Sequence, residues 1–417
     1  MRIIVLCPHF APDTAPTGTV MTGIVDELIS RGHDIHVVTS LPWYRNHAVE
    51  QGWTGRWIRR ETTDWGSITR ITPFAGGDRR RLVRRAAGFI GFTALAGLAA
   101  VRVGRGRKVD AVLSMSPPLT LGPVGVWVAR WRSARCVFNI QDVFPDAAVR
   151  TGAITSRRVI AAAEWLERRT YAASDAVTVL SDDLATNVRT KLARVRRANT
   201  DVVVIANFVD AERLAIDLPA APSRVGADTD YLREYAPGDS PVVMYAGNCG
   251  FSQSLDLMVA AAERFPAVRF IINGDGAARS ELDRAAQRLA NLTTVDYQPT
   301  DRLAEVLASA DLHVVPLRRG LGDVSVPSKT YTVMAAGRAV LAAIDADTEV
   351  ARILNDAGAG VRIEPDDVDA FCAAIDDMLS DMDELRTMGE RGRQWVVEHA
   401  SPAAVGEAYE AVLAPDR

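Results

Sequence analysis

The chain has 417 residues, of which 48% are hydrophobic and 24% are charged, and its formal net charge is -4 at pH 7. This length exceeds what one hydrophobic core usually supports, so two domains are expected, and the charge gives no reason to expect nucleic acid as a partner. The four cysteines, Cys7, Cys136, Cys249 and Cys372, have no metal-like spacing and are interpreted as reduced residues of a cytoplasmic protein.

The first residues predict a strand and not a signal peptide, because their apolar run ends at Cys7 and is too short for a signal sequence. A second apolar run, 86–101, lies between basic residues that extend from Arg79 to Lys108. It has about 16 residues, fewer than the roughly 18–20 that span a bilayer. It is interpreted as a buried helix with basic ends, as a segment that docks on an anionic membrane surface, or as both.

Strand and helix patterns alternate along the first half of the chain, which predicts a parallel α/β sheet. A long loop is expected at 41–66. Strands are predicted at 2–7, 34–39, 67–72, 109–114, 135–140, 176–180 and 202–206, and helices at 17–31 and 79–104.

The alternation stops near Asn207 and resumes after a stretch rich in Pro, Ala, Asp and Gly. We therefore expect an N-terminal domain at 1–210, a linker at 211–240 and a C-terminal domain at 241–400. Both domains are predicted to be Rossmann-like and doubly wound, with ligands in a cleft at the carboxyl ends of the strands. The second series has strands at 241–246, 268–273, 293–297, 312–316, 339–343 and 360–363, and closing helices at 366–379, 383–399 and 403–413.

A glycine turn, Gly247-Asn248-Cys249-Gly250, follows the strand at 241–246, and Ser252 is a natural N-cap for a helix behind it. A strand, a glycine turn and a helix in this order aim free backbone N–H groups and the positive end of the helix dipole at one point. The pattern indicates a phosphate site, although a turn used only for close packing has the same sequence.

A second glycine turn, Gly274-Asp275-Gly276, follows the strand at 268–273. With Asp296 it nearly matches a dinucleotide-binding fingerprint, but Arg279 occupies the third glycine position. A nicotinamide site is therefore the weakest alternative.

Lys329 lies in the first turn of a helix that is expected to start at Pro327 and Ser328 and to end at Gly337. A cation there opposes the helix dipole, and a bound anion would remove the conflict. Lys329 is interpreted as a phosphate ligand, with a solvated surface lysine as the alternative.

In the first half of the chain, two candidate segments follow predicted strands, at the edge of the sheet where the strands have their carboxyl ends. Gly18 is expected at the start of the first helix. There it either lets a donor phosphate or sugar approach the backbone or serves only to start the helix. Gln141 and Asp142 follow the strand at 135–140. Asp142 is expected to hold a sugar hydroxyl or to stabilise positive charge at an anomeric carbon, or else to cap a turn.

Together these segments resemble the retaining, nucleotide-sugar-dependent glycosyltransferases of family 4, which have the GT-B fold. The closer likeness is to the bacterial branch of colanic-acid, O-antigen and capsule synthesis, which includes L-fucosamine transferases. The motifs that carry the resemblance cover nearly the whole chain. They are Ala15-Pro16-Thr17-Gly18, Arg31-Gly32-His33-Asp34, Ser116-Pro117-Pro118-Leu119, Gln141-Asp142-Val143-Phe144-Pro145, Tyr245-Ala246-Gly247-Asn248, Gly274-Asp275-Gly276, Pro327-Ser328-Lys329 and Met334-Ala335-Ala336-Gly337.

The resemblance implies that the second domain binds the nucleotide diphosphate, that the first binds the acceptor, and that the last helix, near 402–413, packs on the first domain. Asp142 and Lys329 are the expected catalytic residues. The residues expected to bind the donor are Gly18, Gly247, Asn248, Gly250, Gln253, Gly274, Asp275, Gly276, Gln298, Pro299, Ser328, Lys329 and Thr332. Of these, Gln298 and Pro299 would meet the base.

The sequence departs from the family pattern at two places. Val324 and Thr332 stand where the family has two glutamates, so contacts to the ribose and the sugar must differ. Asn248 and Gln253 stand near positions where Arg and Lys are common, which leaves more of the phosphate charge to Lys329.

The expected activity is transfer of a sugar from a UDP-sugar, with an N-acetylated amino sugar among the candidates. The acceptor would be a glycan or a lipid-linked sugar, at the inner face of the plasma membrane. No Asp-x-Asp motif is found at the cleft, so no cofactor and no obligatory metal are expected. The alternatives are a UDP-sugar epimerase of the same fold and a non-catalytic nucleotide-sugar-binding subunit.

Overall fold

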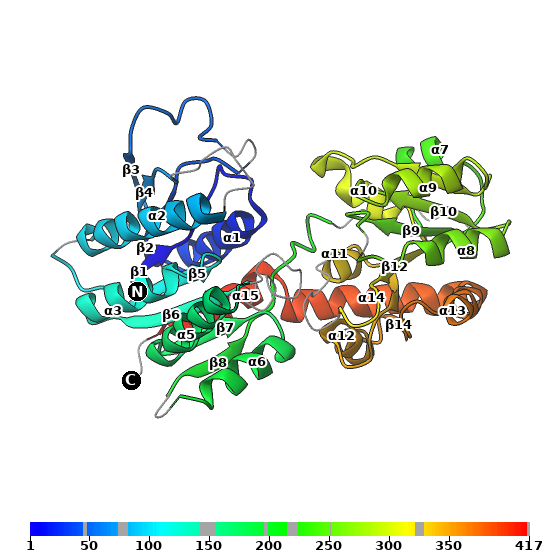
Figure 1. The fold of residues 1–417 in the computed structure, drawn as a ribbon. Coiled ribbons are helices and arrows are strands. Elements are labelled where there is room, and N and C mark those ends of the chain that lie inside the picture. Colours follow the sequence, from blue (N-terminus) through cyan, green and yellow to red (C-terminus); the bar gives the residue numbers. More distant parts are fainter. Residues whose placement is uncertain are drawn as a thin grey trace. The chain divides into compact units, whose positions relative to one another are not determined.

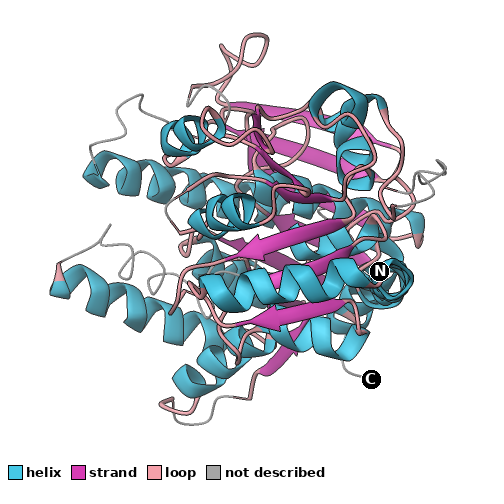
Figure 2. Cartoon of the chain, turned by 90° about the vertical axis from the view of Figure 1, so that its right-hand side faces the viewer, coloured by secondary structure: helices cyan, strands magenta, loops and turns pink. Residues whose placement is uncertain are grey.

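The structure is a computed structural model that describes residues 1–44, 48–73, 82–104, 106–141, 156–195, 199–214, 224–250, 252–321 and 329–414. The chain divides into two compact units. The first comprises Met1–Asn207 with Pro402–Arg417, and the second comprises Phe208–Ser401. Each unit is an α/β layer structure with helices flanking its strands (Figures 1 and 2).

The first unit contains an eight-stranded sheet in the order β3-β4-β2-β1-β5-β6-β7-β8. All neighbouring strands pair in parallel except β3 and β4. The strands are β1 (Arg2–Leu6), β2 (Asp34–Ser40), β3 (Ile58–Thr63), β4 (Gly66–Ile71), β5 (Ala111–Ser116), β6 (Arg135–Ile140), β7 (Ala176–Val179) and β8 (Asp201–Val204). The described helices are α1 (Pro16–Ser30), α2 (Leu82–Arg102), α3 (Leu121–Arg132), α5 (Arg157–Ala173), α6 (Asp182–Leu192) and α15 (Pro402–Leu413).

Strand β3 corrects the long loop expected at 41–66. Its side chains alternate between exposed and half-buried, because β3 is an edge strand that pairs antiparallel with β4. The pattern was missed because the strand carries Arg59, Arg60 and Glu61 and has no apolar run.

The last helix, α15, packs on the first unit and contacts α1. Glu410 on α15 accepts hydrogen bonds from Arg31 at 3.1 Å and is 2.9 Å from a ring nitrogen of His33. The Tyr409 hydroxyl accepts a hydrogen bond of 2.7 Å from the buried amide of Asn139 on β6. These contacts make α15 part of the first unit, as the family resemblance implies.

The second unit contains a six-stranded, all-parallel sheet in the order β11-β10-β9-β12-β13-β14. The strands are β9 (Val242–Ala246), β10 (Arg269–Asn273), β11 (Leu292–Val295), β12 (Leu312–Pro316), β13 (Ala339–Ala343) and β14 (Gly360–Ile363). The helices are α7 (Asp230–Tyr235), α8 (Asp256–Arg264), α9 (Arg279–Ala286), η1 (Thr300–Arg302), α10 (Leu303–Ala308), α11 (Lys329–Ala335), α12 (Glu349–Ala357), α13 (Val368–Ser380) and α14 (Met382–His399).

Within the segment expected to be a linker, 211–240, the described residues from Arg224 onward belong to the second unit and are bonded to it. Arg224 and Asp311 are both fully buried and pair at 3.0 Å. Asp311 also accepts backbone N–H bonds of 2.7 Å from Val225, Gly226 and Val242. This carboxylate therefore ties the segment before α7 to β9 and β12.

The described helices include none that is long and apolar enough to cross a membrane.

Candidate functional site

The two predicted glycine turns of the second unit interlock at the carboxyl ends of β9 and β10. Gly247, Gly274 and Gly276 have φ values of 147°, 145° and 155°, which favour glycine. A side chain on Gly274 would collide with the carbonyl oxygen of Gly247. The glycines are therefore required by close backbone packing at this edge of the sheet.

The N–H groups of the first turn are mostly bonded within the protein. Gly247 donates to Asn273 at 2.8 Å, Cys249 donates to Asp275 at 2.8 Å, and Gly250 donates to the Gln253 side chain at 3.0 Å. The expectation of free N–H groups at these three residues is wrong. The bonds of Gly247 and Cys249 hold the first turn to β10 and to the second turn, and the bond of Gly250 closes within its own loop, which leaves the charge of a ligand to other groups.

Helix α8 also begins later than predicted. Its first residue is Asp256, and the flanking Leu255 makes no side-chain cap, so Ser252 is not the N-cap. The helix dipole is consequently farther from the glycine turn than the sequence analysis expects.

Lys329 is the cation of this site. Its side chain packs over Gly247, where any Cβ would overlap the lysine Cε. Its ammonium donates to the Tyr245 hydroxyl and lies 4.4 Å from the Tyr245 ring centroid. The Tyr245 hydroxyl in turn donates to the Asn248 carbonyl at 2.6 Å. Lys329, Tyr245 and the first turn thus form one connected group.

Burial lowers the pKa of Lys329 from 10.5 to about 8. Within the described chain no carboxylate pairs with this ammonium. A half-buried cation without an anion is costly, and an anionic ligand would relieve that cost. Tyr245 belongs to one of the motifs that carry the family resemblance, but the sequence analysis assigned it no role in the site; it is the last residue but one of β9.

The second glycine turn is held by Arg279, which starts α9. Its guanidinium donates to the Gly274 carbonyl and pairs with Asp283 at 2.7 Å and Asp296 at 2.9 Å. Asp296, the residue at the ribose-carboxylate position of the dinucleotide fingerprint, is therefore already paired. Asp275 is exposed and accepts the Gly276 N–H at 2.7 Å.

The remaining predicted donor residues lie at neighbouring positions. Gln298 follows β11, and its side-chain oxygen accepts from Arg302 at 3.1 Å, while Pro299 is exposed. Thr332 is half-buried in the first turn of α11 beside Lys329. Asp142, Ser328 and Val324 lie outside the described residues.

In the first unit, Gly18 lies on α1 beside His9, where a Cβ would be 2.9 Å from the His9 Cβ. Its lack of a side chain therefore makes room for His9. The Nδ1 of His9 lies 2.7 Å from the fully buried carboxylate of Asp13, which also accepts the Tyr44 N–H at 3.2 Å. Trp43 stacks on His9 with ring centroids 5.5 Å apart.

Sequence reasoning missed this His–Asp pair. The spacing of four residues was visible, but the aromatic partners come from the loop after another strand. Gln141, which was expected at the same edge, is buried and donates to the Asn139 side chain at 3.0 Å.

The chain matches two family models, Glycosyl transferase 4-like domain over residues 17–207 and Glycosyl transferases group 1 over residues 240–381. It is 26% identical over 389 residues to the colanic acid biosynthesis glycosyl transferase WcaI of Escherichia coli (strain K12), which covers 90% of this chain and 91% of WcaI.

Two solved structures have the same fold, GT-B. Sucrose-phosphate synthase of Thermosynechococcus elongatus superposes with a TM-score of 0.70 at 17% identity over 99% of this chain and 98% of that chain. HepE of Anabaena, in complex with UDP, superposes with a TM-score of 0.64 at 14% identity over 99% of both chains.

Proposed function

Because the chain belongs to the glycosyltransferases that these two family models describe, we propose that it transfers a sugar from a UDP-sugar to an acceptor with retention at the anomeric carbon. The acceptor in this proposal is a glycan or a lipid-linked sugar, and the donor sugar is a hexose or an N-acetylated amino sugar. The name of WcaI supports a role in cell-surface polysaccharide synthesis, and the UDP bound by HepE supports the choice of nucleotide.

The observation that carries the proposal is the half-buried ammonium of Lys329 at the carboxyl edge of the second sheet, which pairs with no carboxylate of the described residues. In the transfer, the oxygen of the acceptor hydroxyl bonds to the anomeric carbon, the bond from that carbon to the diphosphate breaks, and its electron pair stays with the diphosphate, which takes up the proton that the hydroxyl loses. Negative charge grows on the leaving group, and a nearby ammonium in a partly dry site stabilises the transition state. Lys329 is a half-buried ammonium of this kind.

We place the acceptor on the first unit, at the carboxyl end of β1. Asp13 binds one ring nitrogen of His9, which leaves the other nitrogen, Nε2, for a ligand hydroxyl. Trp43 and Tyr44 add aromatic surface beside it. Asp142 lies outside the described residues, and its role toward the sugar stays part of the proposal on the sequence alone.

The proposal is tested by thermal unfolding with UDP, GDP, ADP and NAD in parallel. A ligand that binds only the folded state raises its stability by an amount that grows with the logarithm of its concentration over Kd. We expect a rise in Tm with UDP alone. A rise with NAD alone would overturn the proposal in favour of a dinucleotide site at Gly274 and Gly276. If no nucleotide raises Tm, the assignment of Lys329 fails.

Turnover separates the remaining alternatives. An epimerase converts a UDP-sugar in the absence of an acceptor, whereas a transferase shows at most slow hydrolysis. A binding subunit shifts Tm with UDP and converts no donor under any condition.

A further inference from the structure

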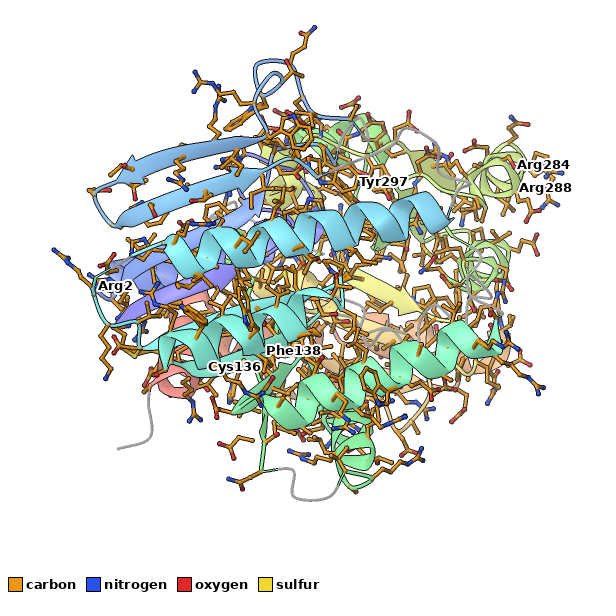
Figure 3. The ribbon with its side chains drawn as sticks, turned by 60° about the vertical axis from the view of Figure 1, so that its left-hand side comes forward. Arg2, Cys136, Phe138, Arg284, Arg288 and Tyr297 are labelled. Atoms are coloured by element: carbon orange, nitrogen blue, oxygen red, sulfur yellow. The ribbon has the colours of Figure 1, made fainter. Side chains whose placement is uncertain are left out.

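Helices α2 and α3 carry a patch of exposed, bulky apolar side chains on the first unit. Ile90 and Leu98 on α2 are 60% and 47% exposed, and Trp127 and Trp131 on α3 are 43% and 67% exposed. The two helices lie side by side, and Figure 3 shows them turned toward the viewer, in front of the strand that carries Cys136 and Phe138. We call these four residues the α2–α3 patch.

No described residue of the first unit covers this face. Phe92, Ala96 and Ala100 fill the opposite side of α2 and are buried against the sheet. Gly97 lets the helices approach, since a Cβ there would lie 3.2 Å from the Trp127 ring. A groove of about 530 Å³ runs along the patch. It is lined by Leu98, Val101, Arg102, Gly106, Arg107, Trp127, Trp131 and Arg132.

The stretch of sequence that carries the patch is basic. Between Arg79 and Gln141 the sequence has twelve Lys and Arg residues and a single acid, Asp110. Asp110 is engaged by the backbone N–H of Arg2 at 2.7 Å, and Lys108 lies 3.9 Å from it. Arg79 and its neighbours up to Arg85 add charge in the sequence, but their side chains lie outside the described residues.

The arginines at the patch divide into two kinds. Arg132 has a structural role, because it donates to the carbonyls of Val101, Val103, Gly104 and Arg107 and so holds the end of α2 to α3. Arg102, Arg107 and Arg130 are exposed, and none of them pairs with a described carboxylate. Their charge is available to an external anion.

From these observations we infer that the α2–α3 patch docks on an anionic lipid surface, with Trp127 and Trp131 at the level of the headgroups and Arg102, Arg107 and Arg130 against lipid phosphates. Tryptophan has an apolar ring and a polar N–H, which suits a membrane–water interface, and basic residues near it add electrostatic attraction. A second copy of the chain is a poorer occupant, since a two-fold contact would bring the same arginines together.

The test is co-sedimentation of the full chain with vesicles of phosphatidylglycerol mixed with phosphatidylcholine, against vesicles of phosphatidylcholine alone. We expect binding to the anionic vesicles only, and weaker binding at high salt. The double substitution Trp127→Gln and Trp131→Gln should lower the partition coefficient at least tenfold. Arg102→Gln with Arg130→Gln should lower it about fivefold and reduce the dependence on salt.

The matched control is Trp57→Gln, because Trp57 is 69% exposed but lies at the start of β3, on another part of the sheet. This variant should bind vesicles like the parent chain. Tm shifts with UDP, measured in all variants, keep this inference separate from the proposed function. Absent vesicle binding, or equal losses for the Trp57 and Trp127/Trp131 variants, would overturn the inference. A dimer that only the Trp127/Trp131 variant dissociates, without vesicle binding, would also overturn it and assign the patch to a second copy.

Discussion

Two cations of the second unit, Arg224 and Lys329, are surrounded in opposite ways. Arg224 is fully buried, pairs with Asp311 at 3.0 Å and donates to the Ser309 carbonyl at 2.8 Å. Lys329 is half-buried, donates to a neutral tyrosine hydroxyl, and has no carboxylate partner in the described chain.

The difference separates a structural charge from one that is available to a ligand. The charge of Arg224 is balanced inside the protein, so its removal would leave Asp311 buried and unpaired. The charge of Lys329 is balanced by no carboxylate in the part of the chain that the structure describes, and burial holds its pKa far below the usual value. A protein gains no stability from such a lysine, which favours a role in binding an anion.

Arg224→Met should have the largest effect. Removing one partner of a buried ion pair costs about 3–5 kcal/mol of the free energy of unfolding, because the other charge is left without compensation. Urea denaturation would measure this loss. The control is Arg233→Met, since Arg233 is 57% exposed and pairs with Asp228 and Asp230 on the surface, and it should leave the free energy nearly unchanged. Equal effects in the two variants would refute the structural role of Arg224.

Lys329→Met should have the opposite effect, since it should weaken the binding of UDP and leave the free energy of unfolding intact. The variant should be as stable as the parent chain or more so, because it removes a desolvated charge. Its affinity for UDP should fall about 10- to 100-fold, since a hydrogen bond to a charged group contributes roughly 1.5–3 kcal/mol. Calorimetric titration with UDP measures the change. Lys108→Met, at a lysine whose side chain is 78% exposed in the first unit, controls for the loss of one positive charge. Unchanged UDP affinity in Lys329→Met would contradict the assignment.

Much of the fold was predictable, because parallel strands buried on both faces read as apolar runs bounded by turns. The predicted bounds of β6, β12, β13 and β14 equal the observed ones. The parts of the fold that the sequence did not indicate depend on polar and charged side chains. Edge strand β3 carries three charged residues in a row and has β4 as its partner. The segment from Arg224 onward was read as a linker because its anchor, Asp311, is 87 residues away in the sequence.

The sequence predicted which residues form the site better than it predicted the hydrogen bonds between them. Glycine turns and a lysine in a first helical turn are local signals, and they pointed to Gly247, Gly274 and Lys329. The contact of Lys329 with Tyr245 joins residues 84 positions apart, and no local pattern indicates it. The N–H groups of Gly247 and Cys249 were expected to be free because their acceptors, on β10 and the second turn, are set by strand order. The roles of these residues in binding a donor stay predictions.

The pH dependence of UDP binding gives the smallest and sharpest test of the comparison. The free protein loses the Lys329 proton near pH 8, and a bound diphosphate would keep that proton, because it raises the pKa of the ammonium beside it. Affinity should therefore be full below pH 8 and fall above it, to about tenfold weaker at pH 9 than at pH 7. Burial raises the pKa of Tyr245 and of Cys249, so neither neighbour becomes charged in this window.

The diphosphate itself is fully ionised above pH 7, since its last proton leaves near pH 6. Calorimetric titration at pH 9, in two buffers of different ionisation enthalpy, should show proton uptake on binding. Lys329→Met should abolish both the proton uptake and the fall in affinity, and Lys108→Met should preserve them.

The free energy of unfolding gives an independent test of the lowered pKa of Lys329. Because the folded pKa lies below 10.5, the unfolded chain holds this proton more tightly, so the contribution of Lys329 to stability should become more favourable as pH rises from 8 to 10.5. An affinity for UDP that is constant from pH 7 to pH 9 would mean that Lys329 does not face the diphosphate.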